Sequence, residues 1–144
     1  MSDMPQGRFL DGKKVLIAFE HKLNKELLVS ALKQCGAGTT ISGPPPEMLS
    51  RIKEFKPDIV LCEYDMDQVN GADFIRFIRK EMHIAAPVVM LVHRGDATAQ
   101  SRCRAVGVEQ ILILPFANLD IMTALKKVSG TEVAAVKKEL YFGE

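Results

Sequence analysis

The sequence has almost no net charge and few cysteines. Its 144 residues sum to a formal charge of +1, so no excess of one sign points to nucleic acid or to an anionic membrane. Cys35, Cys62 and Cys103 are widely spaced without a Cys-x-x-Cys pair, which favours buried thiols over a disulfide or metal site. No apolar run approaches the roughly 18 residues of a membrane span, and no signal peptide begins the chain. We therefore expect a cytoplasmic protein with no nucleic-acid and no membrane partner.

Common nucleotide-binding and hydrolase motifs are also missing. No Gly-x-Gly-x-x-Gly follows the first apolar strand, and there is no Gly-Lys-Ser/Thr loop. No serine sits in a nucleophile elbow. These absences leave dinucleotide, P-loop and serine-hydrolase sites unsupported in a chain whose composition, 47% hydrophobic and 26% charged, is typical of one globular domain.

Short apolar strands alternate with amphipathic helices along the chain. The patterns predict strands at 14–19, 39–42, 59–62, 87–92 and 111–114, and helices at 23–35, 47–55, 72–82, 97–106 and 118–128. Within the helices, Leu27, Phe77 and Leu119 are predicted to join the inward apolar faces. We expect a flexible leader at 1–12, one domain at 13–130 and a C-terminal helical tail at 131–144.

The alternation predicts an α/β fold with a doubly wound, five-stranded parallel sheet and helices on both faces. The expected strand order is 2-1-3-4-5, as in flavodoxin-like proteins. Functional groups in such sheets lie at the carboxyl ends of the strands, near the switch point between strands one and three. In this chain those ends carry Phe19-Glu20, Glu63, Val92 and Leu114.

Two segments at these ends carry a family resemblance. Residues 57–71 read Pro-Asp-Ile-Val-Leu-Cys-Glu-Tyr-Asp-Met-Asp-Gln-Val-Asn-Gly, and Pro115-Phe116 follows the last strand. The chain resembles the response-regulator receiver domains, the CheY-like family of bacterial two-component signalling, from about residue 13 to residue 128. The resemblance implies a CheY-like fold and a signalling role without enzymatic activity.

The resemblance also implies a role for each strand-end position. Glu63 stands where the family has its phosphate-accepting aspartate, and Phe19 and Glu20 stand where two acidic residues help to hold magnesium. Val92 replaces a threonine or serine, and Leu114 replaces a lysine, both of which contact the phosphoryl group in the family. Phe116 completes the positions that correspond to the family's switch residues.

These substitutions predict an atypical, degenerate receiver that lacks the phosphoacceptor aspartate. Phe19 removes an oxygen ligand that magnesium requires, and Leu114 leaves no cation to stabilise phosphoryl oxygens. We expect magnesium binding to be weak or absent, with no metal site and no other cofactor. Glu63 has three open interpretations: a permanent mimic of phosphoaspartate, a solvated strand end, or a partner of Arg94 or Lys22.

Two alternatives to a pseudo-receiver remain open. Asp65 or Asp67, just beyond Glu63, would be the acceptor in a working phosphorelay. The vacated pocket or a basic surface would bind an anion in a small-ligand sensor. A transition-metal site is a weaker interpretation of four side chains at the same end of the sheet, Glu20, His21, Glu63 and His93.

The favoured function is that of a stand-alone pseudo-receiver acting by phosphorylation-independent protein–protein interaction. The expected partner is another signalling protein, such as a histidine kinase, a regulator or an output protein. The surface formed by the fourth helix, fifth strand and fifth helix is the candidate for partner binding and for a homodimer. Arg94, Arg102 and Arg104 are predicted to give it a basic side that suits an acidic partner.

Overall fold

The structure is a computed structural model that describes residues 9–129. Its parallel sheet has the order β2-β1-β3-β4-β5 and is built from β1 (Lys14–Ala18), β2 (Thr39–Gly43), β3 (Ile59–Glu63), β4 (Val88–His93) and β5 (Gln110–Leu114). The helices between and after the strands are α1 (Lys22–Gln34), α2 (Pro45–Phe55), α3 (Gly71–Lys80), α4 (Ala97–Ala105) and α5 (Asn118–Ser129). The predicted flavodoxin-like fold class and strand order are confirmed.

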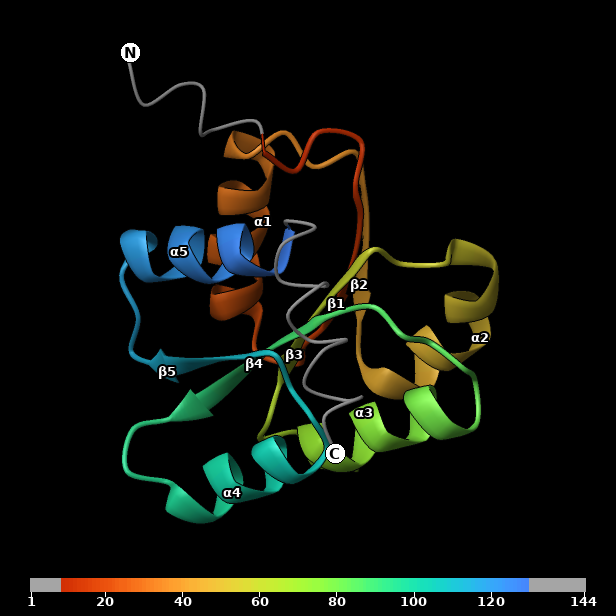
Figure 1. Ribbon diagram of the computed structural model, residues 1–144, viewed down its shortest axis with the longest axis vertical. Helices are drawn as coiled ribbons and strands as arrows, with labels where there is room; N and C mark the ends of the chain where they lie inside the picture. The colour runs from red at the N-terminus through yellow and green to blue at the C-terminus, as the bar shows by residue number, and fades with distance from the viewer. Residues whose placement is uncertain (1–8, 130–144) are drawn as a thin grey trace, which may run out of the picture.

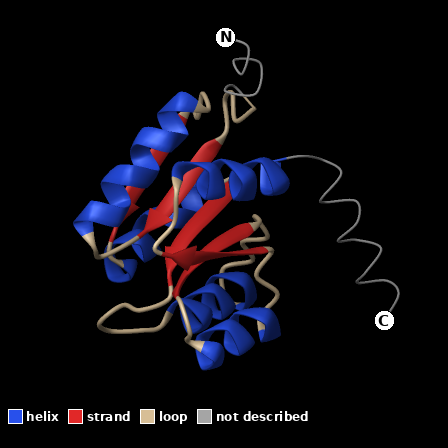
Figure 2. Cartoon of the chain, turned by 90° about the vertical axis from the view of Figure 1, so that its left-hand side faces the viewer, coloured by secondary structure: helices blue, strands red, loops and turns tan. Residues whose placement is uncertain are grey.

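The helices form two layers, one on each face of the sheet. Helices α1 and α5 cover one face, and α2, α3 and α4 cover the other (Figure 1). Seen from the side, the sheet lies between these layers (Figure 2). Two separate cores result, because side chains alternate between the faces along each strand.

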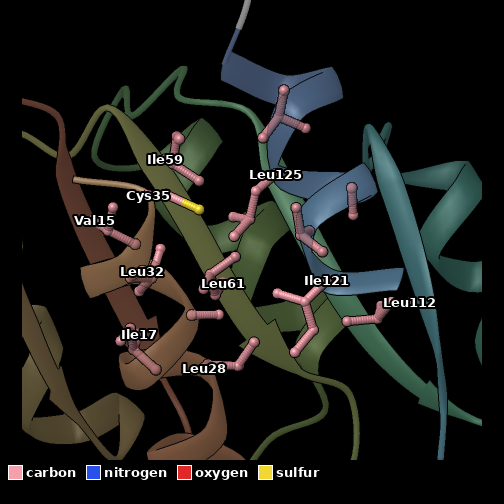
Figure 3. Packing of buried hydrophobic residues seen from close by; sticks show 14 of the residues in the cluster. Val15, Ile17, Leu28, Leu32, Cys35, Ile59, Leu61, Leu112, Ile121 and Leu125 are labelled. Atoms are coloured by element: carbon pink, nitrogen blue, oxygen red, sulfur yellow. The ribbon is translucent and has the colours of Figure 1, made fainter. Parts of the chain in front are cut away.

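The central strand β3 shows this alternation directly. Ile59 and Leu61 pack under α1 and α5, among the residues of Figure 3, whereas Val60 and Cys62 pack under α2, α3 and α4. Every residue of β3 is buried, as expected for a strand covered on both faces. This burial extends to Glu63, which was predicted to follow the strand and instead ends it.

Three apolar side chains that were predicted to face inward lie on the surface. Leu27 is 49% exposed, Phe77 is 44% exposed and Leu119 is 74% exposed. A helix on a sheet buries only one stripe of its surface. In α3 this stripe is already filled by Phe74, Ile75 and Ile78. Apolar spacing in the sequence therefore overstated the width of the buried face.

The packed domain begins earlier than predicted. Leu10 is fully buried in the core beneath α1 and α5, and its backbone N–H donates to the Cys35 carbonyl at 3.0 Å. Residues 9–12, predicted as part of a flexible leader, therefore pack against the domain, since Leu10 gains apolar burial there. Residues 1–8 of that leader and the proposed tail at 131–144 lie outside the described residues.

Gly71 begins α3 at a point of close backbone contact. Its N–H donates to the Tyr64 carbonyl at 2.8 Å. A Cβ atom at this position would lie 2.5 Å from the Glu63 carbonyl oxygen and 2.5 Å from the Met90 sulfur. No rotamer change relieves a clash with a backbone oxygen, so only a glycine fits here without a backbone shift.

We predict that Gly71→Ala lowers the free energy of unfolding by about 2 kcal/mol, the cost of overpacking a filled site. Urea denaturation followed by circular dichroism measures this change. Gly95→Ala is the matched control, because no atom lies within 4 Å of its Cβ position and only its φ of +85° is strained. Equal stability losses in the two variants would contradict a steric role for Gly71.

Candidate functional site

Glu63 lies at the carboxyl end of β3 and is only 3% exposed. Its Oε1 atom accepts hydrogen bonds from the backbone N–H groups of Glu20 at 2.7 Å and His21 at 3.2 Å. Its Oε2 atom lies 2.7 Å from Nδ1 of the His21 ring. Both carboxylate oxygens are therefore bound by the loop between β1 and α1.

This geometry rules out two of the three interpretations of Glu63. The solvated strand end is wrong, because the side chain is buried. The expected cation partners Arg94 and Lys22 are also wrong, because the carboxylate bonds His21 and the adjoining backbone. A strand-end carboxylate was expected to reach outward, but the nearest unsatisfied donors are those before α1, so it turns inward.

The contact with Glu63 supplies the start of α1 with interactions that the helix itself does not provide. The first N–H groups of a helix have no partner within it, and its N-terminus favours negative charge. His21 is the N-cap of α1, makes no side-chain capping bond, and is followed by no acidic residue in the first turn. Glu63 supplies a negative charge at this end from another strand, and so fastens β3 to the start of α1.

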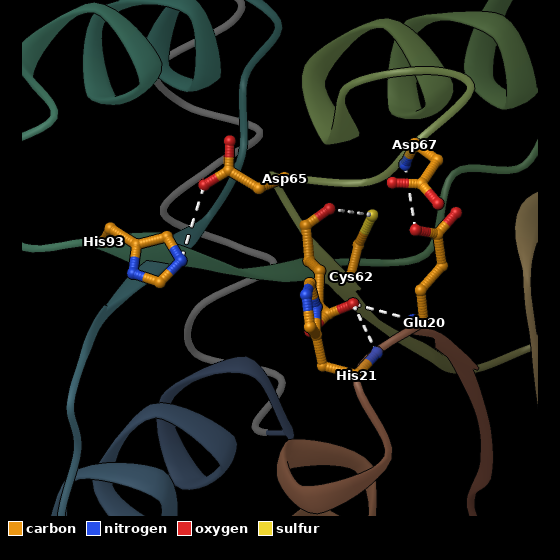
Figure 4. Close-up of polar contacts among 7 residues, drawn as sticks. Glu20, His21, Cys62, Asp65, Asp67 and His93 are labelled. Carbon is orange, nitrogen blue, oxygen red and sulfur yellow. Dashed lines mark hydrogen bonds and ion pairs between the residues drawn. The ribbon is translucent and has the colours of Figure 1, made fainter.

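Phe19 and Glu20, the two residues directly before His21, have separate roles. Glu20 Oε1 accepts a hydrogen bond from the Asp67 backbone N–H at 2.8 Å, which joins the β1–α1 loop to the β3–α3 loop (Figure 4). Phe19 is 2% exposed and packs in the core beneath α1 and α5. The ring of Phe19 in the core therefore occupies the position of one expected acidic residue. The other acidic residue, Glu20, accepts a hydrogen bond from a backbone N–H.

The remaining predicted positions present apolar groups to this edge of the sheet. Val92 is fully buried under α3 and α4. Leu114 and Phe116 are half-buried against the opposite core, on either side of a cis peptide bond between Leu114 and Pro115. None of the three side chains has a polar atom that could bind an anion.

The four side chains considered as a metal site do not converge. His93 lies 3.6 Å from Asp65, through Nε2 and Oδ2, and both side chains are at least half exposed. His21 instead bonds Glu63. Within residues 9–129, no three histidine, cysteine, aspartate or glutamate side chains gather closely enough to hold a metal. The transition-metal interpretation therefore has no geometric support.

The three cysteines are free and buried. The Cys62 thiol donates to the Glu63 carbonyl at 3.3 Å. Burial raises the pKa of Cys62 well above its ordinary value, and the nearby negative charge of Glu63 raises it further. Burial also raises the pKa of Cys103, to about 11. The thiolate is the reactive form, so neither residue is suited to nucleophilic chemistry.

The predicted basic side is not one surface. Arg102 Nη1 donates to the Tyr64 hydroxyl at 3.2 Å, and Arg104 Nη2 donates to Gln100 Oε1 at 3.3 Å. The hydrogen bond with Tyr64 raises the pKa of the Arg102 guanidinium. Positions two apart on a helix differ by about 200°, so these arginines flank the buried side chain of Cys103 from opposite sides of α4. Arg94 lies beyond β4, in the loop before α4.

Sequence patterns missed a buried ion pair at the opposite edge of the sheet, where β4 and β5 begin. Arg79 in α3 bonds both carboxylate oxygens of Glu109, at 3.0 and 3.2 Å, and the carbonyls of Ala86, Val106 and Gly107. Glu109 Oε1 also accepts from the Val88 N–H at 2.8 Å. The sequence offered no signal for this network, because both residues look like ordinary surface charges.

In the part of the chain that the structure describes, no helix combines the length and apolarity needed to cross a membrane.

A family model described as "Response regulator receiver domain" matches residues 15–126. Chemotaxis protein CheY of Thermotoga maritima is 29% identical over 121 residues, which are 82% of this chain and 98% of that protein. Regulator of RpoS of Escherichia coli is 26% identical over 111 residues, which are 77% of this chain. The match spans only 33% of that relative's length.

Solved structures agree on the fold. The chemotaxis response regulator CheY4 of Vibrio cholerae superposes with a TM-score of 0.73 at 19% identity, over 81% of this chain and 98% of that one. NtrX from Brucella abortus gives a TM-score of 0.77 at 18% identity, over 92% of this chain and 30% of that one. The family match covers most of the chain and coincides with the β2-β1-β3-β4-β5 sheet. The chain therefore belongs to the response regulator receiver domain family of two-component signalling.

Proposed function

We propose that this receiver acts as a pseudo-receiver, which binds other signalling proteins without being phosphorylated. One observation carries the proposal: the Glu63 carboxylate is 3% exposed and both of its oxygens are bound by the β1–α1 loop. A phosphoacceptor must reach a donor with a free, in-line oxygen. The Glu63 carboxylate offers no such oxygen.

The surrounding residues also do not fit magnesium, the metal that the family implies at this edge. Magnesium takes oxygen ligands in near-octahedral geometry. Phe19 contributes no oxygen and is part of the core, and Glu20 already accepts a backbone N–H. Val92 and Leu114 provide neither a hydroxyl nor a cation for a phosphoryl group. The donor set therefore supports neither the metal nor the transfer.

The buried Glu63 carboxylate holds β3 and α1 in one fixed arrangement, where a phosphorylated receiver would change between two. Its bonds to Glu20 and His21 join β3 to α1 without any phosphoryl group. A permanent mimic of phosphoaspartate would need groups on β4 and β5 that read the charge, and Val92 and Leu114 have no hydrogen-bonding atoms. The proposed output is therefore a constant binding surface offered to a kinase, regulator or output protein.

We predict that the protein gains no phosphoryl group when it is incubated with magnesium and acetyl phosphate. Intact-protein mass spectrometry measures the gain, and a receiver with an aspartate at the acceptor position serves as the positive control. Glu63→Asp is also expected to remain unlabelled, because Phe19, Val92 and Leu114 are unchanged. A labelled native protein would overturn the proposal, and label mapped to Asp65, whose side chain is 50% exposed, would support the phosphorelay alternative.

A further inference from the structure

Helix α3 presents an exposed aromatic ring between positive side chains. Phe77 is 44% exposed, follows Arg76 directly and lies one turn before Lys80. The inward stripe of α3 is filled by other residues, so the ring is not needed to complete the core. A single exposed apolar side chain is common on protein surfaces, but aromatic residues and arginine are enriched in protein interfaces.

Two hollows lie along α3 near this ring. A groove of about 610 Å³ lies between α3 and α4, and a smaller hollow of about 370 Å³ lies beside Phe77 and Glu81. Both are lined by Asp73, Arg76 and Lys80, so they are neighbours on one area of α3. We call this area, together with Phe77 and Arg102, the α3 surface.

The groove has a firm apolar floor. Ala72, Ala105 and Val106 line it, and Ala72 is 1% exposed. One wall contains Arg79, whose guanidinium is held by Glu109 and by the carbonyl of Val106 at the end of α4. These bonds fix α3 against α4, so the groove is formed before any ligand arrives.

The charges along the groove favour an acidic ligand. Arg79 is matched by Glu109, which leaves Arg76, Lys80 and Arg102 facing the carboxylate of Asp73 in the groove. Glu81 adds one further carboxylate in the smaller hollow, so positive side chains remain in excess. Arg76 and Asp73 are paired at the surface, with side chains 57% and 50% exposed. Such exposed pairs are weak, so Arg76 can exchange this partner for a carboxylate from outside.

We propose that the α3 surface docks an acidic segment of a partner protein, with an apolar side chain of that segment covering Phe77. Arginine and aromatic residues are enriched in protein interfaces and supply much of their binding energy. A phosphorylated small molecule fits less well, because the Arg79 donors are already used and such a ligand would leave Phe77 uncovered. The proposal rests on the proposed function only in taking partner binding as the output.

The site differs from the surface that the sequence suggested. That surface combined α4, β5 and α5, with Arg94, Arg102 and Arg104 as its charges. The α3 surface takes only Arg102 from the predicted arginines and adds Arg76 and Lys80 from α3. Helical geometry places Arg102 and Arg104 on different sides of α4, so the two surfaces can be tested separately.

The test uses the full chain and a fluorescein-labelled synthetic peptide in which glutamates flank a leucine pair. A second peptide with glutamines in place of the glutamates measures the part of binding that is not electrostatic. Fluorescence anisotropy gives the dissociation constants, and amide chemical shifts locate the bound peptide. We expect the glutamate peptide to bind and to shift the resonances of Arg76, Phe77, Lys80 and Arg102.

Matched variants separate the α3 surface from other exposed groups. Lys80→Glu is expected to weaken binding by about tenfold through charge reversal, and Phe77→Ala by a similar factor as loss of an interface anchor. Arg104→Glu and Leu119→Ala remove a charge and an apolar group that do not line the groove, and both are expected to bind as the native chain does. Thermal melting of each variant checks that it folds.

Four results would overturn the inference. In the first, the glutamate peptide binds no better than the glutamine peptide, and in the second, the control variants lose as much peptide affinity as Lys80→Glu and Phe77→Ala. In the third, pyrophosphate binds in a way that depends on Lys80 but the peptide does not bind. In the fourth, the protein self-associates and Phe77→Ala abolishes that association. None of these measurements involves phosphoryl transfer. The pseudo-receiver proposal, which is tested by mass after acetyl phosphate treatment, can therefore fail or survive independently.

Discussion

Replacing Glu63 with alanine is expected to lower the free energy of unfolding by at least about 3 kcal/mol, because a hydrogen bond to a charged group is worth about 1.5–3 kcal/mol and more than one is lost. The change removes the acceptor of the Glu20 and His21 backbone N–H groups and the partner of the His21 ring. It also removes the negative charge at the start of α1. Urea denaturation, monitored by circular dichroism, measures the loss.

The matched variant for this experiment is Glu63→Gln. Glutamine keeps the size of the side chain and one acceptor oxygen for the two N–H groups, but it lacks the charge. We expect a smaller loss than in Glu63→Ala, since an uncharged acceptor contributes about 0.5–1.5 kcal/mol per hydrogen bond. An alanine variant as stable as the native protein would show that water replaces the carboxylate without cost, and that Glu63 does not fasten β3 to α1.

Arg79→Ala is expected to have an effect at least as large, about 3–5 kcal/mol, the usual consequence of removing one partner of a buried ion pair. Glu109 is 4% exposed on its side chain and would keep a buried charge without its guanidinium. The carbonyls of Ala86, Val106 and Gly107 would lose donors as well. Thermal or urea denaturation measures the difference.

Arg76→Ala provides a control on the same helix. Its ion pair with Asp73 has a shorter distance, 2.6 Å against 3.0 Å for Arg79 and Glu109. Both of its side chains are at least half exposed, and exposed pairs contribute only about 0–1 kcal/mol. If Arg76→Ala destabilised the protein as much as Arg79→Ala, burial would not be the reason for the importance of Arg79.

The two residues with the largest expected effects join different elements. Glu63 joins the sheet to α1, and Arg79 joins α3 to the C-terminal end of α4 and to the segment before β4. Buried charges are costly unless they are paired and hydrogen-bonded, and the described part of the chain leaves no buried side-chain nitrogen or oxygen atom without a partner. In both networks, paired and hydrogen-bonded charges therefore join elements of the fold.

Local pattern in the sequence was enough to predict the strands and the helices, and the sheet order followed from the likeness to flavodoxin-like proteins. The apolar segments of the five strands, the Gly and Pro residues that end elements, and the Asp96 N-cap, whose side chain accepts from the Ala99 N–H, are encoded over a few neighbouring residues. The strand-end rule then located Phe19, Glu63, Val92 and Leu114 at one edge of the sheet. The element positions need only periodicity and chain connectivity, whereas the shared edge also needs the sheet order of the fold class.

The tertiary structure alone decided what those residues contact. Glu63 and His21 are 42 positions apart, and Arg79 and Glu109 are 30 apart. Whether a carboxylate turns inward, or Phe77 stays exposed, depends on which donors and side chains other elements bring beside it. Sequence periodicity gives the direction of a side chain within its own element, but hydrogen bonding and burial are set by neighbours that only packing brings together.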